Sequence, residues 1–189
     1  MADLTFSCRC GALGGTFDSR PGRDTHIRCH CGDCRAFLRT TSGEDPGTAG
    51  VGIVQTAPEQ VRIDRGAGHL RALVLAPGRS LVRWYAGCCG TPIAATPRSR
   101  AIPFAGLLTG TFADPAPLGR VAVRGFLPPR SPGGPQRHEG LPTLIARMVR
   151  RIAASRLTGG WRSNPFFADG RPVAEIRPLT EEERAAAYA

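Results

Sequence analysis

Three cysteines lie close together near the start of the chain, at positions 29, 31 and 34. A Cys-x-Cys-x-x-Cys spacing brings three thiols to one point with little loop to order, and zinc binds thiolates at ~2.3 Å in a tetrahedral arrangement. Cys29, Cys31 and Cys34 would fill three corners of that tetrahedron. The fourth corner takes another protein ligand in a structural site, and water or a substrate in a catalytic site.

The chain holds seven cysteines, all of them in clusters: Cys8, Cys10, Cys29, Cys31, Cys34, Cys88 and Cys89. Because seven is odd, the thiols cannot all pair as disulfides within one chain. Seven cysteines divide into a closed site of four and an open site of three, which predicts two zinc ions per chain. The closed site would combine an early pair, Cys8 and Cys10, with a late pair, Cys88 and Cys89. The alternative is one closed site, in which Cys88 or Cys89 completes the triplet and the other thiols are free. Thiolate-rich sites of either kind favour zinc or an iron–sulfur cluster.

The length, the N-terminal sequence and the charge favour a single-domain protein without a membrane segment. A chain of 189 residues favours one domain with one sizeable core. The N-terminus has neither a basic start nor an apolar run, and no stretch of eighteen apolar residues occurs, so we expect a cytoplasmic protein without a membrane segment. The net charge is +10, and all 25 basic residues are arginines. These arginines are scattered without a block of five, which favours a solvated basic surface over a nucleic-acid interface.

Residues 1–126 are predicted to form a mainly β, zinc-binding domain. Short apolar or alternating segments without a long helix are typical of such domains. The predicted strands lie at 4–6, 16–17, 25–28, 51–55, 61–64, 69–75, 80–85 and 93–94.

Residues 127–189 are predicted to form a Pro/Gly-rich loop and a helical tail packed on that domain. The loop covers 127–142, and a short helix is predicted over 181–188. Between them, helical spacing predicts an amphipathic helix. Its apolar face, which we expect to dock on the β domain, would hold Leu144, Ile145, Met148, Val149 and Ile152. The opposite face would hold Arg147, Arg150 and Arg151.

Three motifs over about residues 4–110 resemble one known family. They are Cys8-x-Cys10-Gly11, Cys29-His30-Cys31-x-x-Cys34-Arg35 and Cys89-Gly90-Thr91-Pro92. Their order and spacing are similar to those of the glutathione-dependent formaldehyde-activating enzymes, a family that includes centromere protein V. The resemblance implies a zinc-bearing β-tent of the Mss4-like kind. It also implies a structural zinc at Cys8, Cys10, Cys88 and Cys89, and a second zinc with an exchangeable position at Cys29, Cys31 and Cys34.

The late cysteine pair departs from the family pattern. The family carries Cys-x-x-Cys-Gly before Thr-Pro, and here the first of those cysteines falls on Ala86, so Cys88 must replace it. Adjacent side chains on an extended backbone point to opposite faces. We therefore expect a local turn, permitted by Gly87 and Gly90, if Cys88 and Cys89 bind one ion.

A zinc ion with three thiolates favours a soft fourth ligand, and a small thiol similar to glutathione is the natural one. The resemblance therefore implies a carbon–sulfur lyase activity, in which the thiol forms or releases an adduct with an aldehyde such as formaldehyde. Arg35, beside the motif, is the first candidate to bind a carboxylate of the thiol, and Asp33 is a candidate to orient the ligands. The alternative is a non-catalytic zinc module that contacts a partner through its arginines.

Overall fold

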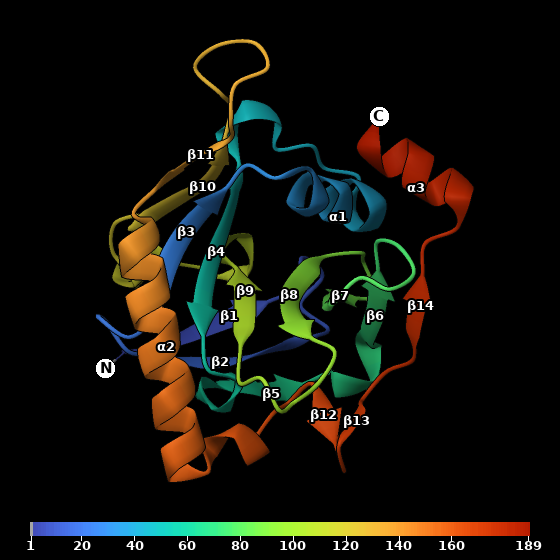
Figure 1. Cartoon of the computed structure of the whole chain (residues 1–189). Helices are drawn as coiled ribbons and strands as arrows, with labels where there is room; N and C mark the ends of the chain where they lie inside the picture. The colour runs from blue at the N-terminus through green and yellow to red at the C-terminus, as the bar shows by residue number, and fades with distance from the viewer. Residues whose placement is uncertain (1) are drawn as a thin grey trace.

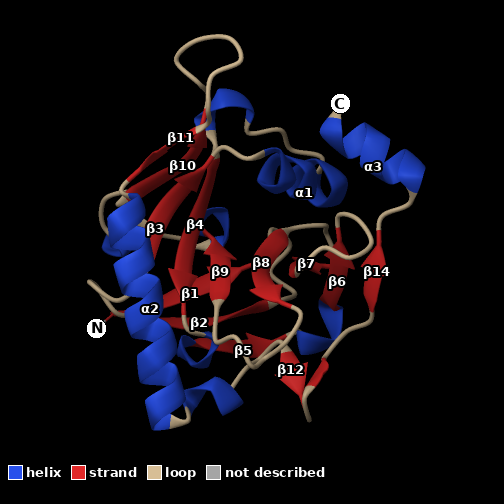
Figure 2. Cartoon of the chain, viewed as in Figure 1, coloured by secondary structure: helices blue, strands red, loops and turns tan. Residues whose placement is uncertain are grey.

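The computed structural model describes residues 2–189, and the chain folds as a mainly β protein with three α-helices (Figures 1 and 2). The larger sheet has nine strands, in the spatial order β11-β10-β3-β4-β9-β8-β7-β6-β14. Neighbouring strands are antiparallel, except that β10 pairs parallel with β3 and β14 pairs parallel with β6. In chain order these strands are β3 (Thr25–Cys29), β4 (Val51–Thr56), β6 (Leu70–Val74), β7 (Leu81–Ala86), β8 (Pro92–Pro97), β9 (Ala105–Leu108), β10 (Val123–Leu127), β11 (Arg137–Glu139) and β14 (Ile176–Pro178).

Two smaller sheets complete the β structure. One joins β1 (Ala2–Ser7), β2 (Gly14–Ser19) and β5 (Val61–Arg65). The other is a hairpin of β12 (Phe167–Ala168) and β13 (Arg171–Pro172). Short 3-10 turns lie at Gly47–Ala49, Pro58–Gln60, Ala67–His69, Thr109–Thr111, Ala116–Leu118 and Gly160–Arg162. Each strand predicted from the sequence is present, and the tail adds β11 and β14 to the large sheet.

The three helices begin and end where local chemistry allows. Helix α1 (Gly32–Ser42) ends at Gly43, whose positive φ of 74° suits glycine. Helix α2 (Leu141–Thr158) has proline in its first turn and ends at Gly159, with a φ of 74°. Helix α3 (Glu181–Tyr188), which matches the predicted 181–188, starts with a capping box. Helices α1 and α3 pack together at one end of the large sheet, and α2 runs along its other side (Figure 1).

Strands β7, β8 and β9 in the large sheet are buried on both faces, and alternate residues of β7 enter different apolar clusters. On β7, Trp84 faces the cluster shared with the small sheet, whose largest members include Phe6 and Phe17. Tyr85 faces the opposite cluster, which contains Phe37 of α1. This second cluster also holds two cysteines of the triplet, so the triplet lies between the sheet and α1.

Helix α2 contacts the rest of the protein through polar groups as well as through part of the predicted apolar face, of which Leu144 packs against the second cluster. Arg151 is only 3% exposed, and its guanidinium donates to the carbonyl of Arg23 at 2.7 Å and to the Thr25 hydroxyl at 2.9 Å. The predicted core residues Ile145 and Val149 are 49% and 57% exposed. The prediction was therefore correct only in part, because periodicity cannot show that oxygen acceptors just before β3 and at its start bind a guanidinium.

The tail is anchored in the main core beyond α2. Phe166 is fully buried, with its ring centroid 5.2 Å from that of Trp84. The indole Nε1 of Trp84 in turn donates to the Thr96 hydroxyl at 2.9 Å. None of the helices in the described residues 2–189 has the length and apolarity needed to cross a membrane.

Candidate metal centres

The early and late cysteine pairs come together in one cluster of four. All four Sγ atoms lie within 4.8 Å of one another. The Sγ of Cys8 is 3.5 Å from that of Cys10 and 3.8 Å from that of Cys88, and Cys88 Sγ is 3.9 Å from Cys89 Sγ. These thiols therefore meet although they come from segments about eighty residues apart.

Two tight turns deliver the four thiols. The first follows β1, where Gly11 has a φ of +77° and the Cys8 Sγ accepts the Leu13 backbone N–H at 3.3 Å. The second follows β7, where the Gly90 N–H donates to the Ala86 carbonyl at 2.7 Å. Residues 87–89 form a turn rather than a strand, so the adjacent Cys88 and Cys89 reach the same point, as the sequence required.

Gly90 also joins this turn to α1. Its φ is +72°, and a Cβ at this position would collide with the carbonyl of Thr41 near the end of α1. A larger residue would therefore separate the helix from the turn. Arg9 connects the two cysteine-bearing turns to each other, because its guanidinium donates to the Cys89 carbonyl at 3.0 Å.

The remaining three cysteines form a separate cluster at the start of α1. Their Sγ atoms also lie within 4.8 Å of one another, and no His, Cys, Asp or Glu of the described residues adds a fourth ligand atom. Cys29 ends β3, and Cys34 lies in the first turn of α1; both are buried, at 7% and 5% exposed. Cys31 is half-buried and is therefore the member that an incoming molecule can reach.

The sulfur spacing fits zinc. Tetrahedral Zn–S bonds of ~2.3 Å imply S···S separations of roughly 3.8 Å. The hydrogen-bonded sulfur pairs lie at 3.3 Å (Cys29 and Cys31) to 3.9 Å (Cys88 and Cys89), close to that value. The donor set is all sulfur, which suits zinc and excludes hard cations such as magnesium. The residues present therefore fit a closed four-thiolate site and a three-thiolate site.

Hydrogen bonds within the triplet favour a thiolate at Cys31. Cys31 is the N-cap of α1, and its Sγ accepts hydrogen bonds from the Cys29 thiol at 3.3 Å and the Cys34 backbone N–H at 3.4 Å. The hydrogen bonds from the Cys29 and Cys34 thiols lower the pKa of Cys31 to about 2, and Arg83 contributes through its charge. By donating to Cys31, the Cys29 thiol has its own pKa raised to about 11. Helix N-termini and cations commonly favour thiolates in this way.

Arg35 and Asp33, the two polar candidates beside the motif, are engaged with protein groups. The Arg35 guanidinium makes two contacts with the Asp45 carboxylate, Nε to Oδ1 at 3.3 Å and NH2 to Oδ2 at 3.2 Å. Hydrogen bonds from Arg35 and then Arg39 hold the pKa of Asp45 well below its ordinary value. Asp33 accepts the Tyr188 hydroxyl of α3 at 2.7 Å, so the C-terminal helix is tied to the cysteine motif.

Sequence reasoning missed Arg83, which approaches the triplet from β7. Its NH1 lies 4.0 Å from the Cys34 Sγ, and the residue is only 5% exposed. One signal was present in the sequence. Leu81, Arg83 and Tyr85 alternate along a predicted strand, so an arginine sits at a position that shares a face with apolar residues.

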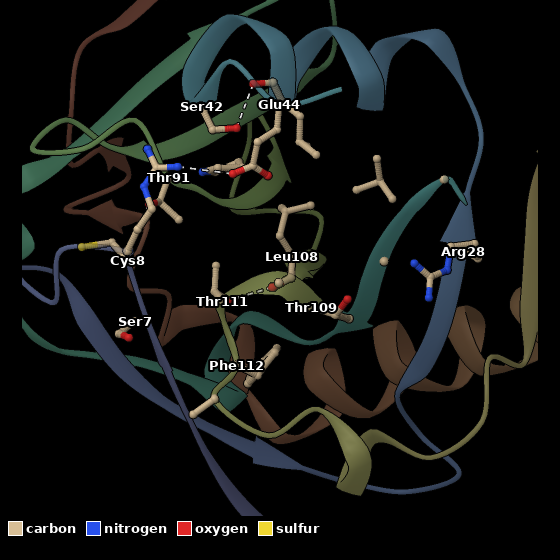
Figure 3. A pocket seen from close by; sticks show the side chains of 18 residues that line it. Ser7, Cys8, Arg28, Ser42, Glu44, Thr91, Leu108, Thr109, Thr111 and Phe112 are labelled. Atoms are coloured by element: carbon tan, nitrogen blue, oxygen red, sulfur yellow. Dashed lines mark hydrogen bonds and ion pairs between the residues drawn. The ribbon is translucent and has the colours of Figure 1, made fainter. Parts of the chain in front are cut away.

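A cavity of about 500 Å³ lies on the side of the four-cysteine cluster (Figure 3). Cys8 is on one side of it, Arg28 of β3 is on the other, and Leu108 and Phe112 supply apolar surface. The Glu44 carboxylate within it accepts from Arg9 at 3.3 Å. None of the triplet cysteines lines this cavity, so the three-thiolate site and the cavity are separate features.

Comparison with known proteins gives a family match. A family of unknown function, DUF6151, matches residues 2–177. The chain belongs to this family. Among curated proteins, none matches the chain. A crystal structure of a Rhodobacter sphaeroides protein is similar at 21% identity with a TM-score of 0.45, over 62% of this chain and 97% of that one.

Proposed function

We propose that this DUF6151 member is a two-zinc protein whose three-cysteine centre binds a small thiol and forms or cleaves its adduct with an aldehyde. In this proposal it is a divergent relative of the glutathione-dependent formaldehyde-activating enzymes, with a β-tent of the Mss4-like kind. Cys8, Cys10, Cys88 and Cys89 hold a structural zinc. Cys29, Cys31 and Cys34 hold the zinc of the reactive centre.

The observation that carries the proposal is the division of seven thiols into four and three. The triplet lacks a fourth ligand atom from the described residues 2–189, whereas the other cluster is complete. Structural zinc sites are four-coordinate, and catalytic sites keep a position open for water or substrate. The half-buried Cys31 marks the side from which a ligand approaches the centre.

A zinc ion held there would supply a vacant position for a soft ligand and a positive charge that favours the thiolate form of an incoming thiol. In the proposed reaction, the thiol sulfur forms a bond to the aldehyde carbon and the C=O π pair moves to oxygen. The thiol proton ends on that oxygen, which gives a hydroxymethyl thioether from formaldehyde. The reverse reaction breaks the carbon–sulfur bond.

The residues around the triplet have defined tasks in this scheme. The Cys34 N–H and the N-terminus of α1 stabilise negative charge on Cys31. Leu73, Leu75 and Phe37 pack around the buried sulfurs and exclude water from that side. The Asp33–Tyr188 hydrogen bond holds α3 against the start of α1.

The test is a thiol titration of protein loaded with cobalt in place of zinc. Glutathione should increase the sulfur-to-cobalt charge-transfer absorption as a fourth sulfur enters the triplet. Because the thiol must lose its proton, its apparent affinity should rise as the pH approaches the ordinary thiol pKa of about 8.5. Added formaldehyde should then be consumed in proportion to the hydroxymethyl adduct formed.

Cys31→Ala is the matched control and should not respond to glutathione. If wild-type protein carrying two cobalt ions gives a flat titration at every pH, the open position does not exist. That result would favour the non-catalytic zinc module, in which the arginines contact a partner.

A further inference from the structure

Arg83 carries a buried charge that no carboxylate neutralises. It lies in the middle of β7, paired in register with Leu73 of β6 and Ala95 of β8, and is 5% exposed. Within residues 2–189 it takes part in no ion pair with Asp or Glu, and its buried Nε has no hydrogen-bond partner. Arginine is almost never fully buried unless its charge is paired. Arg151 is equally buried but donates to three oxygen acceptors, whereas the guanidinium of Arg83 has the Cys34 sulfur as its hydrogen-bond partner.

The surroundings of Arg83 offer one kind of anion. Its guanidinium carbon lies 5.7 Å from the centroid of the Phe37 ring, and NH1 lies 4.0 Å from the Cys34 Sγ. The carboxylate of Asp33, also on this side, is engaged by the Tyr188 hydroxyl at 2.7 Å and lies 4.0 Å from Arg79. The aromatic face accounts for part of the contact. Of the two groups in contact with the guanidinium, the Cys34 sulfur is the one that can carry a negative charge.

We infer that Arg83 is the counter-cation of the three-cysteine centre and that its charge lets this centre retain a divalent metal with only three protein ligands. Three thiolates and one Zn²⁺ sum to a charge of −1, and the guanidinium brings the buried unit to zero. Without Arg83 the same unit would be a net anion among apolar side chains, which a low-dielectric environment disfavours. The inference depends on the proposed function only in requiring that the triplet hold a metal.

The four-cysteine cluster supports this reasoning by contrast. Two of its members, Cys10 and Cys88, are exposed, so water can screen the charge of −2 that four thiolates and one Zn²⁺ would carry. The triplet is buried at Cys29 and Cys34 and is the cluster that has a buried arginine beside it. The fold thus places a fixed cation where solvent cannot compensate the charge.

The experiment is a chelator competition on full-length protein loaded with two metal ions. We expect the chelator to remove the two ions in two separate steps, one from each site. Cys31→Ala identifies the step that belongs to the triplet, and the four-cysteine site serves as an internal reference. In Arg83→Met we expect the triplet to lose metal affinity by about ten- to a hundredfold, as for other residues that act through a metal ligand, with the reference step unchanged. Arg83→Lys keeps the charge and should stay within about threefold of wild type.

A spectroscopic readout separates the charge from packing. A cation beside the Cys34 sulfur lowers the energy of its lone pairs, so removing it should shift the sulfur-to-cobalt charge-transfer band to longer wavelength. Arg83→Met should show this shift, and Arg83→Lys should not. The control is Arg79→Met, the same substitution at a 59% exposed side chain on the same side of the protein, which should leave both affinity and band unchanged.

The outcomes are distinct. If Arg83→Met and Arg83→Lys lose metal equally, or if Arg83→Met weakens both steps equally, the side chain acts through packing and the inference is wrong. If Arg83→Met does not fold, the lysine variant alone decides, since retained affinity supports the charge and lost affinity overturns it. If wild-type protein releases only one metal ion, the proposed function fails first, before any Arg83 variant is compared.

Discussion

Replacing Arg151 by methionine tests how α2 is attached to the sheet. The guanidinium makes three hydrogen bonds, to the Arg23 carbonyl at 2.7 Å, the Thr25 hydroxyl at 2.9 Å and the Gln55 side-chain oxygen at 3.3 Å. Hydrogen bonds to charged groups contribute about 1.5–3 kcal/mol each, so three sum to at least ~4.5 kcal/mol. Burial lowers the pKa of Arg151 to about 10, the direction expected when a cation is taken out of water. The substitution relieves that penalty, and the net loss should be about 3–5 kcal/mol.

The assays are equilibrium urea unfolding and thermal unfolding of metal-saturated protein at neutral pH. For a chain of this length, a loss of about 3–5 kcal/mol lowers the melting temperature by roughly 6–20 °C. Arg150→Met, the same change at an exposed neighbour on α2, should alter the free energy of unfolding by less than about 0.5 kcal/mol.

The refuting result is a reversed ranking against Val149→Ala. Val149 is 57% exposed, so this variant should also stay within about 0.5 kcal/mol of wild type. If Val149→Ala were the more destabilising change and Arg151→Met cost under about 1 kcal/mol, α2 would be docked by its apolar face. The hydrogen bonds of Arg151 would then have no role in attaching the helix.

Three further predictions concern the metal centres, the pH dependence and the tail. Elemental analysis should find two zinc ions per chain. Cys10→Ala should lose metal and unfold at lower temperature, whereas Cys31→Ala should lose one ion and keep its fold. The opposite thermal ranking would invert the structural and reactive roles of the two sites. Burial raises the pKa of Asp24, while hydrogen bonds and the charge of Arg151 oppose the rise. Ionised Asp24 therefore weakens the fold at neutral pH and protonation relieves it as the pH falls, so the urea deficit of Arg151→Met should shrink on acidification; a constant deficit would contradict this coupling. Phe166→Ala should cost about 3–5 kcal/mol in urea unfolding because the ring is fully buried, and a loss under about 1 kcal/mol would mean that the tail is not anchored there.

The sequence by itself determined the parts that depend on local spacing. Cys29, Cys31 and Cys34 are close in the chain, so one turn and the start of α1 are enough to gather their sulfurs. Alternating segments predicted the strands, and the helix at Glu181–Tyr188 follows from a cap and good helix formers. The odd cysteine count and the clustering of the cysteines predicted the division into four and three, which the two groups of sulfur atoms confirm.

Only the tertiary structure determined which groups the arginine side chains contact. Helical spacing placed Arg151 mainly on the solvent face of α2, but the structure buries it against backbone and side-chain oxygens. Arg35 was a candidate to bind a ligand because it follows the cysteine motif, and in the structure it contacts Asp45. Arg83 comes within 4.0 Å of Cys34 only because β7 and α1 lie on either side of one apolar cluster. Apolar patterns report burial because every apolar group gains from leaving water. The placement of a buried cation depends on one matching acceptor, which any part of the chain can supply and which therefore appears only when the chain is folded.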